Sequence, residues 1–206
     1  MKFTGWADEA LEFYEGLEAD NTKTYWTRNK HVYDEHVLAP MLALIAELEP
    51  TWGEGKVFRP YRDVRFSKDK TPYKTNIGAR IGGGYVQLDA SGLMVGSGRF
   101  HLESAEVQRF RQAIDNDVSG KQLVSIVSTA RKKGYEANSH DELKTVPRGF
   151  DRDHPRAELL KYKGLIIWRR WDPAAWLGTA AAKKRVTDLF TAAKPLNDWL
   201  GQHVGG

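Results

Sequence analysis

The strongest constraint on the fold is a change in the spacing of apolar residues near position 57. From residue 57 to residue 97, apolar and polar side chains alternate in short runs, and glycine-containing breaks at 82–84 and 89–92 separate these runs. A period of two is typical of β-strands, and short glycine-containing breaks are typical of hairpin turns. The sequence therefore predicts an antiparallel meander over residues 57–97.

Helical spacing flanks this meander on both sides. Near the N-terminus, Leu11, Tyr14 and Leu17 recur at helical intervals, and the polar run 20–22 stops that helix and caps a second one. Helical periodicity returns at about 104–116, 119–133 and 180–200, and an apolar strand is expected at 165–168. Strands between two sets of helices indicate an α+β fold, with a central antiparallel sheet packed against N-terminal and C-terminal helices.

Chain length favours one domain. A chain of 206 residues is long enough to bury a core of its own, and neither an internal repeat nor a low-complexity linker marks a boundary. We therefore expect a single domain over residues 1–206.

Composition and motifs disfavour several classes of protein. The chain has no cysteine, which excludes a disulfide framework, a thiolate zinc site and a thiol nucleophile. The N-terminal residues lack the apolar region of a signal peptide, and no stretch approaches the length of a membrane span. The run 53–56 fails the pattern of a phosphate-binding loop, and the glycines at 82–84 lie between expected strands. We expect a soluble, cytoplasmic protein with no cofactor and no membrane partner.

Asp151, Asp153 and His154 are the one cluster of acids and histidine of chemical interest. A carboxylate beside a histidine suits a metal ligand or a general base, so a metal-assisted hydrolase is one hypothesis. The other interpretation is helix capping, because a polar residue before Pro155 is typical of a helix start. Capping is favoured: we predict that Asp153 or His154 caps a short helix beginning near Pro155, with no metal bound.

Positive charge is concentrated in one stretch, residues 59–74, which we call the basic segment. The whole chain has a formal charge of +4 and a pI of about 9.2. The basic segment holds six basic residues and two acidic ones, so it carries that entire excess, and the remainder of the chain is balanced. A local excess of this kind indicates a surface that binds anions.

Strand alternation would divide the first half of the basic segment into two faces. Arg62 would then share a face with Val64 and Phe66, and should be substantially buried. A buried guanidinium needs a carboxylate, carbonyl groups or a bound anion as its partner. Asp63 would point to the opposite face, so we expect the partner to come from elsewhere in the fold or from a ligand, and the segment to line a concave anion site.

The candidate ligand-binding residues are those whose side chains suit phosphate recognition or support it. They are Arg59, Arg62, Asp63, Arg65, Lys70, Tyr73 and Lys74. Arginine offers bidentate contacts, lysine offers mobile charge, and Asp63 would hold an arginine in position. An equally weighted interpretation is structural: Asp63 and Asp69 neutralise neighbouring cations, and Tyr73 packs beneath the loop.

Two classes of ligand fit the basic segment. The first, and the leading hypothesis from the sequence, is a phosphorylated small molecule or a nucleotide, held by the residues named above. The second is nucleic acid bound without sequence preference, whose affinity should fall steeply with salt. The hydrolase of Asp151, Asp153 and His154 is a third hypothesis of a different class.

Several motifs resemble one known family. The longest runs from Phe58 to Thr75 and contains Arg-Asp-x-Arg-Phe-Ser-Lys-Asp-Lys followed by Pro-Tyr-Lys-Thr. Further matches are Asn21, Tyr25, Trp26, Asn29, Tyr33, Gly84, Tyr85, Gly92 and the run 147–155. Together they resemble a bacterial and fungal family filed as a domain of unknown function, serial number 2461. The resemblance implies a compact α+β domain and brings no established activity.

Overall fold

The computed structural model describes residues 2–205 of the chain. These residues form two compact units. Unit 1 contains the described residues up to Val95 together with Arg170–Thr187, and unit 2 contains Gly96–Arg169 and the described residues from Asp188 onward. Because the chain passes between the units three times, neither unit is one continuous segment, and the single domain stays a prediction.

The helices of unit 1 come first in the chain. They are α1 (Asp8–Ala19), α2 (Lys23–Val32), a π-helical stretch η1 (Tyr33–Leu38) and α3 (Ala39–Trp52). Thr22 caps α2 by accepting from the N–H of Tyr25 at 3.2 Å, as the polar run predicts. Pro40 lies in the first turn of α3, directly after the π-helical stretch, so its missing N–H falls where the hydrogen-bond pattern changes.

Six strands form one sheet in the order β1-β2-β3-β4-β6-β5. Their bounds are β1 Gly55–Val57, β2 Asn76–Ile81, β3 Gly84–Asp89, β4 Gly92–Arg99, β5 Glu136–Asn138 and β6 Leu165–Trp171. β1 pairs with β2, β2 with β3, and β5 with β6, all antiparallel. The predicted antiparallel sheet is thereby confirmed, with β2, β3 and β4 joined by the two predicted turns.

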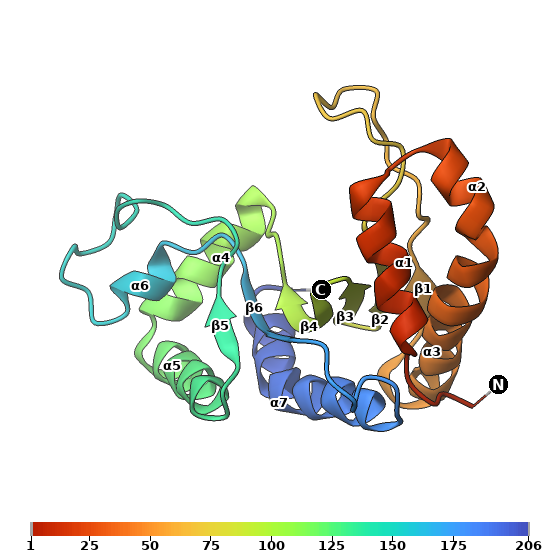
Figure 1. The fold of residues 1–206 in the computed structure, drawn as a ribbon. Helices are drawn as coiled ribbons and strands as arrows, with labels where there is room; N and C mark the ends of the chain where they lie inside the picture. The colour runs from red at the N-terminus through yellow and green to blue at the C-terminus, as the bar shows by residue number, and fades with distance from the viewer. Residues whose placement is uncertain (1, 206) are drawn as a thin grey trace. The chain divides into compact units, whose positions relative to one another are not determined.

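Alternation along β2 and β3 buries one face of the sheet in unit 1. Ile77 pairs with Leu88 and Ala79 with Val86, and all four side chains are fully or almost fully buried. α3 packs against β1 and β2. Figure 1 shows α1 and α3 beside these strands. The opposite face of the three strands carries polar and aromatic side chains, among them Lys56, Arg80 and Tyr85.

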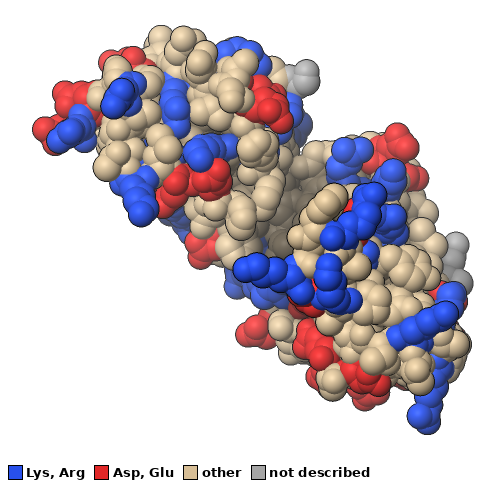
Figure 2. Space-filling view, turned by 90° about the horizontal axis from the view of Figure 1, so that it is seen from above, with Lys and Arg blue, Asp and Glu red and all other residues tan. Residues whose placement is uncertain are grey.

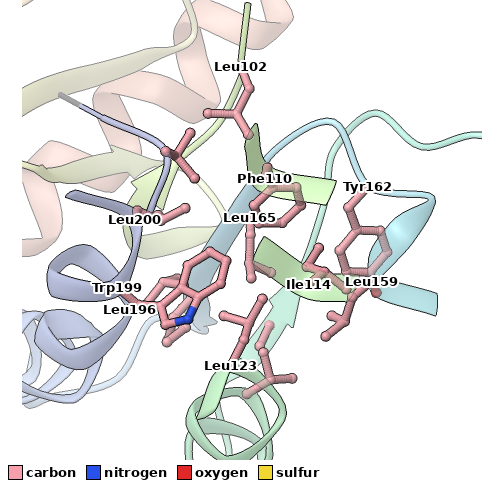
Figure 3. Packing of buried hydrophobic residues seen from close by; sticks show 14 of the residues in the cluster. Leu102, Phe110, Ile114, Leu123, Leu159, Tyr162, Leu165, Leu196, Trp199 and Leu200 are labelled. Atoms are coloured by element: carbon pink, nitrogen blue, oxygen red, sulfur yellow. The ribbon is translucent and has the colours of Figure 1, made fainter. Parts of the chain in front are cut away.

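Unit 2 is built around its own apolar core. Its helices are α4 (Ser104–Asp115), α5 (Asp117–Lys132), α6 (Ala157–Leu160) and the latter part of α7 (Ala181–His203). Figure 3 shows Phe110, Leu123, Leu165 and Trp199 meeting in this core. The strand β6 and the C-terminal helix α7 contribute to the same cluster, so the prediction of terminal helices packed on the sheet is confirmed at both ends.

No helix within residues 2–205 combines the length and the apolar character that crossing a bilayer requires.

Candidate functional site: the basic segment

The basic segment is a projecting loop, where the sequence predicts a strand as far as Phe66. The chain leaves β1 at Val57 and enters β2 at Asn76, and a single isolated bridge, between Tyr61 and Tyr73, joins the two arms. Backbone bonds from Arg62 N to Pro72 O (2.9 Å) and from Lys74 N to Pro60 O (2.8 Å) hold the arms together. In Figure 1 the segment is the yellow-orange loop that extends beyond α1 and α2.

The base of the loop near Tyr73, which we call its foot, contacts the N-terminal helices and the turn between them. Asn21 donates to the carbonyl of Tyr73 at 3.0 Å and accepts from its N–H at 3.1 Å. The ring of Tyr73 stacks on Trp26, with centroids 4.4 Å apart and an interplanar angle of 6°. Tyr73 is buried, and burial raises the pKa of its hydroxyl, with the nearby Tyr61 as a smaller cause. Its placement matches the structural interpretation, in which it packs beneath the loop.

Arg62 is held by residues of the loop itself. Its Nη1 donates to the carboxylate of Asp69 and to the hydroxyl of Thr71. The hydrogen bond from Arg62, followed by those from Thr71, lowers the pKa of Asp69 to about 2. The Arg62 side chain is 29% exposed, so it is half-buried instead of substantially buried. The partner was expected to come from elsewhere in the fold or from a ligand, but it is Asp69 of the same segment.

The predicted division of residues 61–66 into two strand faces is wrong. Phe66 is 97% exposed, although alternation places it on one face with the half-buried Arg62 and Val64. Alternating burial requires a sheet on one side of the strand, and here no neighbouring strand follows the arm beyond the bridge at Tyr61. The chain bends at the tip of the loop instead of continuing as a strand. There Lys70 Nζ donates to Val64 O at 2.9 Å.

Asp63 forms an ion pair with Arg65. The sequence analysis expected this carboxylate to hold an arginine in position. Arg65 donates from Nε to Asp63 Oδ1 at 2.9 Å and from Nη2 to Oδ2 at 2.6 Å. These bonds lower the pKa of Asp63 and raise that of Arg65. Both side chains are exposed, and exposed ion pairs contribute little to stability. The pair therefore orients the Arg65 guanidinium at the tip of the loop.

The other basic side chains of the loop have few protein partners. Arg59 and Lys68 make no hydrogen bond or ion pair with any residue from 2 to 205. Lys74 Nζ lies 5.8 Å from the centroid of the Phe58 ring. Figure 2 looks down on the projecting loop and shows Lys and Arg side chains gathered over it. The charge excess of the chain is therefore displayed on one exposed loop.

Asp151, Asp153 and His154 lie in the turn that precedes α6. Asp151 Oδ1 accepts from the N–H of Asp153 at 2.9 Å, and His154 Nδ1 accepts from the N–H of Arg156 at 3.0 Å. The prediction that Asp153 or His154 caps the helix is wrong. α6 begins at Ala157, its N-cap is Arg156, and no side chain caps it. The side chains of Asp151 and His154 therefore accept from backbone N–H groups of the turn, six and three residues ahead of the first residue of the helix.

The described residues form no metal-ligand cluster at the turn before α6. Across residues 2–205, no three His, Asp or Glu side chains are grouped so that they could hold a metal ion. His154 Nε2 lies 3.3 Å from one carboxylate oxygen of Asp115, which makes a pair and not a triad. The hydrolase hypothesis therefore has no convergent ligands here to support it.

The most buried arginine is one that the sequence analysis missed. Arg156 is 6% exposed, and its Nε donates to Ile114 O at 2.6 Å. Its Nη2 donates to Asp115 O at 2.8 Å and to Asp117 Oδ1 at 3.2 Å. The guanidinium thus satisfies carbonyls at the end of α4 and joins them to the start of α5. These partners are some forty residues away in the chain, so no local pattern signals them.

A second missed feature is a hydrogen-bonded row on β3. Tyr85 donates to Gln87 Oε1 at 2.9 Å, and Gln87 Nε2 donates to Asp89 Oδ2 at 2.8 Å. Arg170 donates to both carboxylate oxygens of Asp89, at 2.7 and 3.0 Å. Burial raises the pKa of Tyr85, and the Asp89 carboxylate adds to this. The sequence did hold a signal for this row, because Tyr85, Gln87 and Asp89 occupy alternate positions of the strand and so share one face.

The fold and the loop define an α+β protein with a six-stranded antiparallel sheet and a projecting cationic loop between its first two strands. The chain belongs to the family described as conserved hypothetical protein (DUF2461), whose model matches residues 9–199. The resemblance noted from the motifs is thereby confirmed. No curated protein and no solved structure matches this chain significantly.

Proposed function

We propose that the protein binds nucleic acid without sequence preference, through the phosphate groups that contact its basic segment. The observation that carries this proposal is a projecting loop with an excess of four positive charges and a fully exposed phenylalanine near its tip. A repeating phosphate chain can contact several cations spread along a convex loop. A single small anion needs them gathered around one point.

The ion pairs within the loop leave donors available for a ligand. Arg62 uses Nη1 for both of its bonds, and its Nε and Nη2 have no partner in the described chain. Asp69 and Asp63 therefore orient two guanidinium groups without using all of their N–H donors. Oriented guanidinium groups suit phosphate, because two N–H groups meet two phosphate oxygens.

Phe66 supports nucleic acid over other polyanions. A phenylalanine that is 97% exposed contributes nothing to the core, and its burial against a ligand would be favourable. Aromatic side chains stack on unpaired bases, and every base offers such a surface, so the contact needs no particular sequence. Arg65 and Lys68 flank it closely in the chain and suit the adjoining phosphates.

A phosphorylated small molecule or free nucleotide is supported less well by the same geometry. Small-molecule sites are concave and enclose most of the ligand. Two of the surface pockets, of about 520 and 410 Å³, lie in unit 2, and neither includes a residue of the basic segment. The small-molecule hypothesis therefore becomes one arm of the test.

The test is fluorescence anisotropy with a labelled oligothymidylate of about 20 nucleotides, long enough to span one binding surface. The double variant Arg59→Ala/Lys68→Ala removes two cations that make no bond within residues 2–205, so folding should be unaffected. We expect roughly tenfold weaker binding. The matched control, Lys133→Ala/Lys144→Ala, removes two exposed lysines of unit 2 and should bind like the unmodified protein.

Two results would contradict the proposal. One is equal weakening by the two double variants, which would indicate dependence on net charge alone. The other is saturable binding of ATP or inorganic phosphate with no binding of the oligonucleotide, which would favour the small-molecule ligand.

A further inference from the structure

The register of β1 and β2 places two cations directly opposite each other. Lys56 pairs with Arg80, and both side chains are exposed on the sheet face that points away from the buried Ala79. Neither makes a hydrogen bond or ion pair with any residue from 2 to 205. Like charges directly opposite each other destabilise a sheet. An anion bound on this face would relieve the repulsion.

Two aromatic rings lie on the same face. The N–H of Phe58 donates to Gly78 O at 2.8 Å, so the chain stays extended for one residue beyond β1 and returns Phe58 to the side of Lys56. Tyr85 pairs with Arg80 and therefore shares the face as well. The ring centroids of Phe58 and Tyr85 are 6.2 Å apart, with 36° between the ring planes. Phe58 is 40% exposed, so part of this aromatic surface is open to solvent.

A glycine and a polar row fix the position of Tyr85. A Cβ added to Gly78 would lie 2.6 Å from the Tyr85 hydroxyl oxygen and 3.2 Å from its ring, so the missing side chain of Gly78 makes room for the tyrosine to lie across β2. The hydroxyl donates to Gln87, which in turn donates to Asp89. A ring whose hydroxyl is bonded, and which has room over Gly78, is preorganised to receive a flat partner.

Each ring lies beside a basic residue, and the acidic residue in the same row of β3 is already paired with an arginine. Arg80 lies opposite Tyr85, and Lys74, at the foot of the basic segment, lies over Phe58. Asp89 belongs to the same row of β3, but Arg170 occupies both of its carboxylate oxygens. The face therefore combines aromatic rings with uncompensated positive charge, and Lys74 makes it continuous with the basic segment.

We infer that this sheet face binds a single nucleic-acid strand, with bases stacked on Phe58 and Tyr85 and phosphates held by Lys56, Arg80 and Lys74. The inference rests on the proposed function and narrows it to unpaired strands. Base faces are open in a single strand, whereas in a duplex they are covered by neighbouring base pairs, so the rings would have nothing to stack on. We therefore expect the protein to prefer a single strand to a duplex of the same length.

The test compares two kinds of variant with the same oligothymidylate and with a duplex of equal length. Phe58→Leu/Tyr85→Leu keeps the charge and most of the apolar volume, and should weaken single-strand binding about tenfold while leaving duplex binding nearly unchanged. Phe100→Leu is the matched control, because Phe100 is an exposed phenylalanine of unit 2. It should bind like the unmodified protein.

Lys56→Gln/Arg80→Gln covers the case in which the aromatic variant fails to fold. It removes no packing, and it should weaken oligonucleotide binding while keeping or raising the melting temperature, because the like-charge contact is lost. Weaker binding without a gain in melting temperature still supports the inference. Unchanged oligonucleotide binding would overturn it.

The outcomes separate this inference from the proposed function. If Arg59→Ala/Lys68→Ala weakens binding but neither sheet-face variant does, the sheet-face inference is overturned and the basic segment stands. Equal affinity for duplex and single strand also overturns the inference alone. Binding to vesicles of phosphatidylcholine and phosphatidylserine, with no binding of either nucleic acid, overturns both.

Discussion

Arg62 and Asp69, seven positions apart, form an ion pair that closes the basic segment on itself. Thr71 joins the pair by hydrogen bonds to both side chains. The Arg62 that was expected to require a partner from elsewhere in the fold or from a ligand is therefore held from within the loop. The Nε and Nη2 groups of Arg62 make no bond to any residue from 2 to 205.

The first prediction concerns the titration of Asp69. In the unmodified protein its pKa is about 2, because Arg62 and Thr71 donate to the charged carboxylate. In Arg62→Gln we expect the pKa to rise toward the ordinary 3.8. Since the folded pKa is the lowered one, the contact contributes fully above about pH 4 and is lost as pH falls toward about 2. Carboxyl NMR during acid titration measures this, and an ordinary pKa in the unmodified protein would refute the pairing.

A second prediction concerns the anchor at the foot of the loop. Asn21→Ala removes two hydrogen bonds to the backbone of Tyr73, and we expect it to lower the free energy of unfolding by about 1–2 kcal/mol. It should also speed trypsin cleavage within the basic segment, which has five cleavable basic residues, since Arg59 precedes Pro60. Urea denaturation and limited proteolysis measure the two effects.

Asn29→Ala is the control for this anchor. Asn29 donates to Tyr25 O one helical turn away, within α2, so its removal should leave the trypsin cleavage rate unchanged. If Asn21→Ala is cleaved no faster than Asn29→Ala, the loop does not depend on this anchor.

The third prediction concerns the buried guanidinium of unit 2. Arg156→Met leaves the carbonyls of Ile114 and Asp115 without their donor, and should lower the free energy of unfolding by about 3 kcal/mol. Arg152→Met, at an exposed arginine of the same turn, should change it by less than about 0.5 kcal/mol. Urea denaturation compares the two, and equal stability would show that the Arg156 contacts contribute nothing.

Gly120 supplies an independent check of the same contact. A Cβ at this position would lie 2.1 Å from Ile114 O and 2.6 Å from Arg156 Nε. Gly120→Ala should therefore be destabilising, although alanine is ordinarily favoured over glycine inside a helix such as α5. A stabilised variant would mean that Ile114 O and the Arg156 side chain do not lie this close to Gly120.

Local sequence patterns were sufficient to predict most of the fold. β2 and β3 could be predicted because one of their faces is buried, so that Ile77, Ala79 and Ile81 alternate with polar or small neighbours. The same reasoning failed between Tyr61 and Phe66, because an arm without a neighbouring strand has no face to bury. Alternation in a sequence predicts burial only where a partner strand exists.

Contacts between distant positions could not be predicted in this way. Asn21 meets Tyr73 across 52 positions, and Arg156 meets Ile114 across 42. The aromatic pair of Phe58 and Tyr85 depends on strand register and on the missing side chain of Gly78. The charge of the basic segment was readable from the sequence, whereas its projection from the fold required the structure.

The most direct test of nucleic-acid binding by the basic segment is the salt dependence of oligothymidylate affinity. If about four phosphates are engaged, log K should fall with log salt at a slope of about −3. In Arg59→Ala/Lys68→Ala the slope should become shallower by about 1.4, because two fewer phosphates are neutralised. A salt-independent affinity, or the same slope in both proteins, would contradict the account.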